Sequence, residues 1–273
     1  MEVDFKKLTE KYLNLVEIIK KEGCVAVAFS GGVDSSFLCY AAFDALNEKA
    51  IAITIVSPMM PQNEIADAKK ISSLIGIKHI MLEEAEIDDA VAANPKDRCY
   101  HCKKIEFGSI IAEAKKRGVN TVLDGSNTDD TKDYRPGLKA LSELSVLSPL
   151  RLADLSKQDI RDLSKKFNIP TWNKPAAACL ASRIPYGETI SKEKLRRIED
   201  AENILRECGF NQFRVRSHGD IARIEVAPNE RQLFFNSETL NHVSKQIKNA
   251  GFLFVAMELE GYDMGSLNRV HQK

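Results

Sequence analysis

Residues 25–36 read VAVAFSGGVDSS, an apolar run that passes through Ser-Gly-Gly-Val-Asp-Ser directly into a helical pattern. In an open parallel sheet, ligands bind beyond the carboxyl ends of the strands, where the following helix presents unpaired N–H groups and its positive dipole end. Gly31 and Gly32 let the backbone approach an anion closely. Hydroxyl donors can come from Ser30, Ser35 and Ser36. The stretch therefore predicts a phosphate-binding loop, although a glycine turn with a serine helix cap would also explain Gly31 and Ser35.

Apolar, β-branched runs alternate with helical patterns after this loop, as expected for a parallel sheet covered on both faces. The predicted strands are 24–29, 50–56, 79–84 and 120–125, and the predicted helices are 35–46, 63–76 and about 100–117. The fold class is therefore α/β, with a doubly wound parallel sheet.

The pattern changes in the C-terminal part of the chain. Residues 126–152 are polar and irregular, and a capping-box pattern at Ser156 and Asp159 predicts the start of a helix. The predicted elements that follow are helix 191–208, strands 212–217 and 220–226, helix 230–249 and strand 252–259. We expect a first domain of residues 1–187 and a smaller α+β domain of residues 188–273, which would serve substrate binding or oligomerisation.

The composition is that of an ordinary globular protein. Among 273 residues, Lys and Arg together number 39, as do Asp and Glu, so the formal net charge is zero. Bulk charge gives no reason to expect a nucleic-acid or membrane partner. The N-terminus lacks the apolar core of a signal peptide, so we expect a cytoplasmic protein with reduced thiols, and the six cysteines are not a disulfide framework.

The loop has neither the GxxxxGK[ST] nor the GxGxxG pattern. SGGVDS after the first strand instead resembles the PP-loop of the ATP pyrophosphatases, whose domain is PP-loop/HUP-like. The resemblance implies cleavage of ATP between the α and β phosphates and adenylation of a substrate oxygen. The nucleotide-binding residues would be Ser30, Gly31, Gly32, Val33, Asp34, Ser35 and Gly125.

Three further strings narrow the resemblance: DGSNTDDTKDYRPGLKA (124–140), WNKPAAACLASRIPYGETI (172–190) and RVRSHGDIARIE (214–225). Together with the loop, they resemble LarE, a family of ATP-dependent sulfur transferases. This resemblance implies adenylation of a carboxylate of a pyridinium dicarboxylate mononucleotide and its conversion to a thiocarboxylate for the nickel-pincer nucleotide. It also implies a homo-oligomer.

Adenylation requires charge to be spread over a pentavalent phosphate, for which loop N–H groups, Mg²⁺ and cationic side chains are suited. Asp34, a predicted catalytic residue, is a candidate Mg²⁺ ligand with Asp129 and Asp130. The alternatives are a helix N-cap for Asp34 and a solvated loop for the other two aspartates.

Arg214 and Arg216 are two residues apart on a predicted strand, so both project from one face and could bind a phosphate or carboxylate. A salt-bridged sheet surface is the alternative. Glu202 and Glu225 could support the arginines or be ordinary surface charges.

Cys179 stands in a loop, four residues before Arg183, and a nearby cation would lower its pKa. The family pattern places Ser182 and Arg183 against the substrate phosphate. In one type of LarE, a cysteine of this loop gives up its own sulfur, so each protein molecule acts once.

Cys99 and Cys102 form a CxxC at the start of a predicted helix. Alone, this pattern fits a redox dithiol, half a zinc site or a coincidence. With Cys179 it resembles the three-cysteine subgroup of LarE-like proteins, in which a 4Fe-4S cluster leaves one iron for an extra sulfide. That resemblance favours turnover with an external sulfur source.

Two other functions are compatible with these features. A PP-loop tRNA thiolation enzyme also combines the loop with a cysteine cluster, but the zero net charge and the LarE-like strings argue against it. A non-enzymatic nucleotide and iron–sulfur sensor would bind ATP without forming AMP.

Overall fold

A computed structural model describes residues 5–132, 136–175 and 178–263 and divides the chain into two units. Unit 1 comprises Met1–Glu86 and Asp97–Ala177, and unit 2 comprises Ile87–Lys96 and Ala178–Lys273. The division falls before Ala178, whereas the sequence pattern suggested a boundary after residue 187. The segment Ile87–Lys96 lies early in the chain and belongs to unit 2.

Unit 1 contains a four-stranded sheet in the order β3-β2-β1-β4, and every pair of neighbours is parallel. The strands are β1 (Val25–Ala28), β2 (Ala50–Val56), β3 (Lys78–Glu83) and β4 (Thr121–Leu123). The predicted α/β class with a parallel sheet is confirmed. Because β2 and β4 flank β1 on opposite sides, the strand order reverses beside β1, and its carboxyl end is where such sheets bind ligands.

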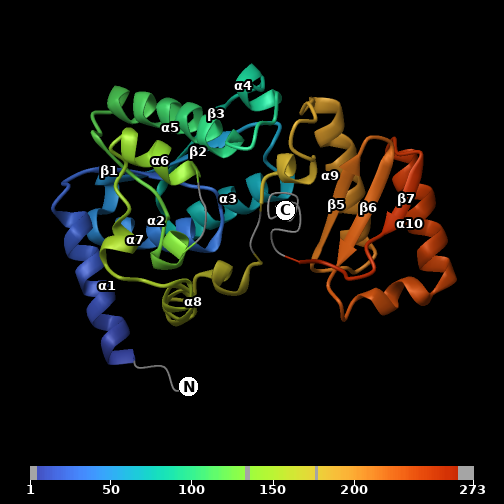
Figure 1. Cartoon of the computed structure of the whole chain (residues 1–273). Helices are drawn as coiled ribbons and strands as arrows, with labels where there is room; N and C mark the ends of the chain where they lie inside the picture. Colours follow the sequence, from blue (N-terminus) through green and yellow to red (C-terminus); the bar gives the residue numbers. More distant parts are fainter. Residues whose placement is uncertain (1–4, 133–135, 176–177, 264–273) are drawn as a thin grey trace. The chain divides into compact units, whose positions relative to one another are not determined.

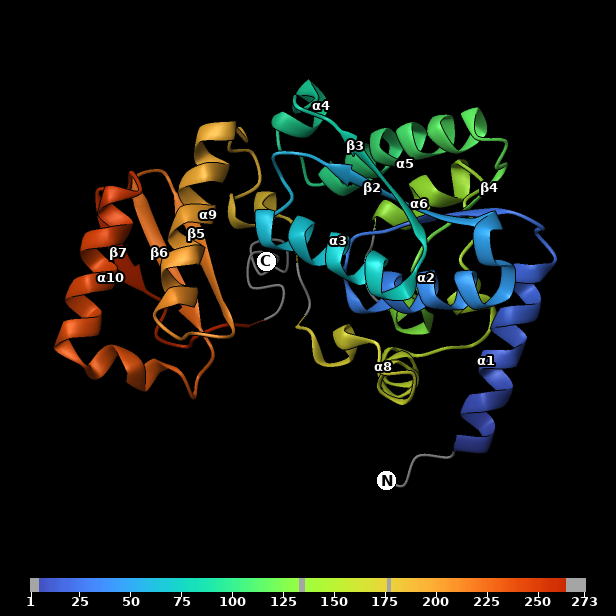
Figure 2. The same cartoon turned by 180° about the vertical axis from the view of Figure 1, so that it is seen from behind.

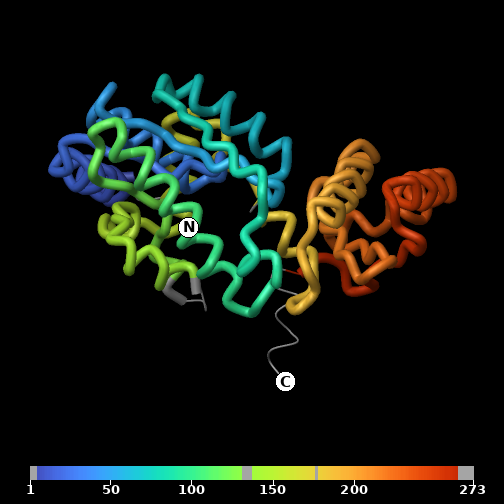
Figure 3. The backbone as a smooth tube through the Cα atoms, turned by 90° about the horizontal axis from the view of Figure 1, so that it is seen from above, coloured from blue at the N-terminus to red at the C-terminus, as the bar shows by residue number. Residues whose placement is uncertain are grey.

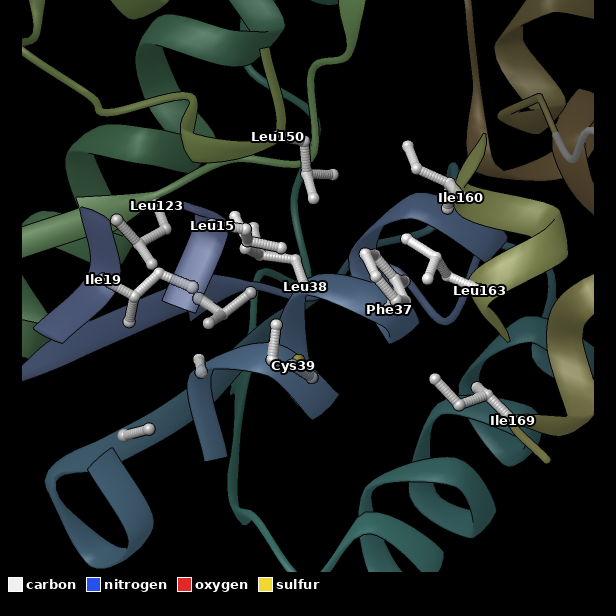
Figure 4. Packing of buried hydrophobic residues seen from close by; sticks show 14 of the residues in the cluster. Leu15, Ile19, Phe37, Leu38, Cys39, Leu123, Leu150, Ile160, Leu163 and Ile169 are labelled. Carbon is white, nitrogen blue, oxygen red and sulfur yellow. The ribbon is translucent and has the colours of Figure 1, made fainter. Parts of the chain in front are cut away.

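Helices cover both faces of this sheet (Figure 1). One face carries α1 (Phe5–Lys20), α2 (Val33–Leu46), α3 (Gln62–Ile75) and α8 (Lys157–Lys166). In Figure 4, Phe37 of α2 lies beside Leu163 of α8, and Leu38 lies beside Leu15 of α1. The other face carries α5 (Arg98–Lys116) and α6 (Pro136–Glu143).

Two regions differ from the predicted pattern. Residues 126–152 contain η2 (Thr128–Lys132), α6 and α7 (Pro149–Leu152), and Leu141 of α6 is buried against the face that α5 covers. The predicted helix 230–249 is divided into η5 (Arg231–Phe235) and α10 (Ser237–Asn249). Asn236 is extended, and its side chain accepts from the amides of the first turn of α10, so a new helix begins there.

Unit 2 contains a mixed sheet in the order β5-β6-β7. The strands are β5 (Phe213–His218), β6 (Ile221–Val226) and β7 (Phe254–Met257); β5 and β6 are antiparallel, and β6 and β7 are parallel. Helices α9 (Lys192–Glu207) and α10 pack on the same face of this sheet (Figure 2).

The early segment of unit 2 contains α4 (Asp89–Ala92) and lies beside residues 184–190 (Figure 3). Asn94 is fully buried and has a positive φ of 53°. Its side-chain amide donates to the carbonyl oxygens of Pro185 at 2.7 Å and Glu188 at 3.0 Å. Its own carbonyl accepts from the Gly187 amide at 2.9 Å. These bonds attach the segment to the chain near residue 185.

No helix within the described residues has both the length and the apolar character needed to cross a membrane.

Candidate functional site

The loop after β1 closes on itself through its serines. The Ser30 amide donates to Ser35 Oγ at 3.3 Å, and the two serine hydroxyls are 3.1 Å apart. Gly32 is the N-cap of α2 and has no side-chain cap, so Ser35 is not a helix cap. Ser36 is fully buried in α2. No side chain of the described residues caps α2, so its first amides could donate to a ligand at the carboxyl end of β1.

Two glycines allow close backbone approach at this loop. Gly31 has a positive φ of 73°, and a Cβ there would lie 3.3 Å from backbone atoms of Glu64 and Ala68 in α3. A Cβ on Gly125, which follows β4, would lie 3.2 Å from the Ser35 amide nitrogen. At both positions a Cβ would require its neighbour to move by a few tenths of an ångström.

Asp34 lies in the first turn of α2 but does not cap it. Its Oδ2 accepts from Lys157 Nζ at 2.6 Å, and its Oδ1 is buried and has no hydrogen-bond partner among the described residues. Burial raises the pKa of Asp34, and Asp130 acts in the same direction, while Lys157 and Arg161 act to lower it. A buried carboxylate oxygen without a partner can accept a cation or a ligand donor.

Asp129 and Asp130 lie in η2 and are held by backbone amides. Asp129 Oδ2 accepts from the Lys157 amide, and Asp130 Oδ2 accepts from the Asn127 amide, each at 2.9 Å. Because both carboxylates accept from backbone amides, this segment is not the solvated loop that was the alternative. They fix η2 next to the N-terminus of α8, beside Asp34.

Sequence reasoning missed three cations that the fold brings to the loop. Lys157 and Arg161 lie one turn apart at the start of α8. The predicted capping box of Ser156 and Asp159, which the structure confirms, begins this helix. Their spacing of four residues on a predicted helix was the available signal. The third is Lys174, whose ammonium group contacts the Gly31 carbonyl oxygen at 3.3 Å.

In unit 2, Arg183 forms a bidentate ion pair with Glu202, with Nε and Nη2 at 2.8 and 3.0 Å from its two oxygens. Arg216 pairs with Glu225 at 2.7 Å and also donates to the Ser182 carbonyl oxygen at 2.9 Å. Arg183 Nη1 donates to Ser182 Oγ at 2.9 Å. Thus the strand, the glutamates and the Ser182 turn form one buried network.

Arg214 lies on the same face of β5 as Arg216. Burial lowers the pKa of Arg214, and the nearby Arg183 and Arg216 act in the same direction, against Glu202. The predicted phosphate-binding residues of unit 2 are therefore brought together. Two of the three guanidinium groups, those of Arg183 and Arg216, are already paired with buried glutamates.

The cysteines differ in exposure: one is buried, Cys99 and Cys179 are exposed, and the others are intermediate. Cys39 is fully buried, and burial raises the pKa of its thiol. Cys99 is exposed in the first turn of α5, and Cys102 Sγ donates to Glu106 Oε1 at 3.2 Å. Cys179 is exposed in unit 2 at the start of η4 (Leu180–Arg183). Cys99 and Cys102 belong to unit 1, and the three-cysteine set stays a prediction.

Comparison with known proteins shows which families and proteins this chain is similar to. Residues 6–118 match the family model described as NAD synthase. A protein of Synechocystis sp., slr1717, described as uncharacterized, is 42% identical over 267 residues, covering 97% of this chain and 100% of that protein. MJ0830 of Methanocaldococcus jannaschii, also described as uncharacterized, is 32% identical, covering 95% of this chain and 98% of that protein.

A relative with a named activity is the pyridinium-3,5-bisthiocarboxylic acid mononucleotide synthase of Lactiplantibacillus plantarum. It is 36% identical over 267 residues, which cover 96% of this chain and 95% of the synthase. Similarity at this level over both full lengths, together with the SGGVDS loop at the carboxyl end of β1, assigns the chain to the LarE family of PP-loop ATP pyrophosphatases.

Proposed function

We propose that this protein is an ATP-dependent sulfur transferase that converts a carboxylate of a pyridinium dicarboxylate mononucleotide to a thiocarboxylate, for nickel-pincer nucleotide synthesis. The observation that carries the proposal is the full-length similarity to the bisthiocarboxylic acid mononucleotide synthase. The PP-loop family implies use of ATP, and the relationship to LarE implies a nucleotide substrate.

The first step is adenylation at the loop after β1. A substrate carboxylate oxygen attacks the α-phosphorus of ATP, the bond to the bridging oxygen of the β-phosphate breaks, and pyrophosphate leaves. The loop amides and the Gly125 backbone would bind the phosphates, and Lys157 and Arg161 would stabilise negative charge that develops at phosphorus. In the second step, a sulfide sulfur attacks the acyl carbon, and AMP leaves with the oxygen.

Magnesium fits one of its predicted ligands better than the other two. Asp34 Oδ1 is the buried oxygen that lacks a partner among the described residues, whereas Asp129 and Asp130 each bind a backbone amide. In the described part of the chain, no three His, Cys, Asp or Glu side chains are grouped closely enough to form a metal site by themselves. Asp34 would therefore hold Mg²⁺ together with phosphate oxygens, as Mg²⁺ commonly binds, and the ion would neutralise phosphate charge.

The arginine network of unit 2 would bind the phosphate of the substrate mononucleotide. Arg214 and Arg216 would contact it directly, with Ser182 and Arg183 beside them, while Glu202 and Glu225 hold the buried guanidinium groups in place. The LarE-like strings in these residues support this assignment.

The sulfur would come from outside the chain. Cys99, Cys102 and Cys179 are thiols, the ligand type of iron–sulfur clusters, and Cys99 and Cys179 are exposed. Cys179 belongs to unit 2 and the other two cysteines to unit 1, and the three do not form a metal-ion group within the described residues. Brought together, they would hold a 4Fe-4S cluster, which would supply an iron that can carry an additional sulfide. The alternative is donation of the Cys179 sulfur itself.

The function is tested by incubating the protein with ATP, Mg²⁺, the dicarboxylate mononucleotide and sulfide. We expect AMP and pyrophosphate in equal amounts. The mass of the product should show that sulfur has replaced one carboxylate oxygen. ATP binding without AMP formation would indicate a sensor, and copurified tRNA that becomes thiolated would indicate a tRNA thiolation enzyme. Light scattering tests the expected homo-oligomer.

The sulfur source is tested by iron and acid-labile sulfide content after anaerobic purification. We expect about four irons per chain, with a sharp fall in Cys99→Ala, Cys102→Ala and Cys179→Ala. Cys208→Ala is the matched control, because Cys208 is the C-cap of α9 and outside the set, and should keep its iron. An iron-free protein whose Cys179 loses the mass of H₂S during turnover would show the sacrificial mechanism instead.

A further inference from the structure

Lys174 connects the nucleotide loop to the segment that leads to Cys179. Its ammonium group donates to Glu64 Oε2 at 2.8 Å, to Asp67 Oδ2 at 2.7 Å and to the Gly31 carbonyl oxygen at 3.3 Å. The side chains of Lys174 and Glu64 are only 16% and 10% exposed. The pair is therefore shielded from water and salt, unlike a surface ion pair.

The bond from Lys174 to the Gly31 carbonyl oxygen affects the orientation of the Gly31–Gly32 peptide in the loop. The Gly31 carbonyl and the Gly32 N–H belong to the same peptide unit, and in a trans peptide they point in opposite directions. The described residues contain no cis peptide bond. By holding the carbonyl, Lys174 fixes the direction of the Gly32 N–H, which could donate to a phosphate bound in this loop.

A second cation holds the same segment. Arg161 donates through Nη1 to the Trp172 carbonyl oxygen at 2.7 Å and through Nη2 to the Lys174 carbonyl oxygen at 2.9 Å. The segment is a turn, because the amides of Trp172 and Lys174 donate to Ile169 and Thr171. Cys179 follows Lys174 by five residues, which span at most about 18 Å.

We propose that Lys174 is a positioning residue that couples occupancy of the nucleotide loop to the docking of residues 170–174. Phosphate bound to the Gly32 amide favours the peptide orientation in which Gly31 accepts from Lys174, and a docked Lys174 favours phosphate binding to the same degree. The inference deepens the proposed function and rests on it: the chain that carries Cys179 is anchored more firmly when ATP is present.

The test is hydrogen exchange at the amides of residues 172 and 174, with and without Mg²⁺ and α,β-methylene ATP. In the wild type, saturating nucleotide should slow exchange at both amides. In Lys174→Met, nucleotide should no longer slow it, and the Kd for the analogue should rise about three- to tenfold, as expected for a lost hydrogen bond.

Two variants serve as controls. Lys165→Met removes an ammonium group that lies 4.9 Å from the centroid of the Trp172 ring and so contacts the segment rather than the loop, and the nucleotide effect should persist. The double variant Glu64→Gln/Lys174→Met leaves no buried carboxylate without its cation and should lose the effect as the single variant does. That result would separate loss of coupling from instability caused by an unpaired charge.

The coupling is overturned if Lys174→Met keeps the nucleotide-dependent slowing, or if the wild type shows none at saturating analogue. Because exchange requires only nucleotide binding, its outcome is independent of the sulfur chemistry. A wild type that forms no thiocarboxylate would overturn the proposed function and leave the coupling in place.

Discussion

Asp34 has two carboxylate oxygens in different surroundings. One is paired with Lys157, and the other is buried without a partner in the described part of the chain. Desolvation of the second oxygen raises the free energy of the nucleotide-free protein, and a bound cation would relieve that penalty. The arrangement is typical of a residue that serves a ligand rather than the fold.

Replacing this carboxylate should remove adenylation without unfolding the protein. For Asp34→Asn we expect pyrophosphate release to fall by about 10²–10³-fold, because a preorganised charge at the phosphates is lost. The melting temperature of Asp34→Asn should differ little from that of the wild type. Asp162→Asn is the control, since Asp162 lies on α8 and accepts from Gln158 in an exposed bond. Wild-type pyrophosphate release by Asp34→Asn would contradict the assignment.

The arginines of unit 2 should separate into binding and structural residues. For Arg214→Met we expect the KM for the mononucleotide to rise about tenfold to hundredfold, because a charge-assisted contact to phosphate is lost. Arg183→Met should instead lower the free energy of unfolding by about 3–5 kcal/mol, since Glu202 would remain as a buried unpaired charge. Initial rates and urea denaturation distinguish the two. Equal effects of both variants on stability would contradict this division.

The loop after β1 contains one residue, Gly31, whose positive φ of 73° glycine adopts without strain. Gly31→Ala should prevent tight nucleotide binding, because its Cβ would press on the α3 backbone. Gly118→Ala is the matched control: its φ is 76°, but a Cβ there meets nothing within 4 Å. We expect about 1 kcal/mol of strain at Gly118 and unchanged nucleotide affinity, measured by calorimetry. Similar affinities for the two variants would show that the contact with α3 is unimportant.

Helix α8 carries Lys157 and Arg161, and its first turn is fixed by the capping box. Ser156→Ala should lower the free energy of unfolding by about 1 kcal/mol and weaken nucleotide binding through displacement of Lys157. Gln158→Ala, which removes an exposed side-chain bond on the same helix, should have a smaller effect on both.

The same capping box predicts a pH dependence. Partial burial acts to raise the pKa of Asp159, but the Ser156 amide and Lys11 hold that pKa below its ordinary value. A depressed folded-state pKa gives stability that is present above the unfolded pKa and lost as pH falls through the folded pKa, here below about pH 4. Asp159→Asn should therefore destabilise the protein at pH 7 more than at pH 3 in urea denaturation. An equal loss at both pH values would contradict it.

Across the molecule, local patterns predicted the elements but not their tertiary partners. The β-branched run at Ala50–Val56 and the glycine after β1 indicated strand and loop, because these signals lie within a few residues. The sequence pattern did not predict helix α6, because its short apolar face, which includes Leu141, lies in a mostly polar stretch of sequence. Lys157 could not be paired with Asp34 from sequence, since 123 positions separate them and only the folded chain joins them.

Asn94 attaches the early segment of unit 2 to the rest of that unit. Asn94→Ala should lower the free energy of unfolding by about 2–3 kcal/mol, because buried carbonyls lose their donor and the positive φ becomes strained. Asn249→Ala, at the exposed end of α10, should change it little. Thermal melting monitors both, and a wild-type melting temperature for Asn94→Ala would contradict the attachment.

The insertion of Ile87–Lys96 into unit 2 also has a consequence for synthesis on the ribosome. The amide of Asn94 finds its acceptor at Ile184, 90 residues later. At about 5–20 residues per second, some 5–20 s pass between the two. Until residue 184 has been made, Asn94 lacks this native acceptor, although strand β4 of unit 1 is made before that point. The order of translation therefore leaves the first piece of unit 2 waiting for the rest of that unit, and open to chaperones meanwhile.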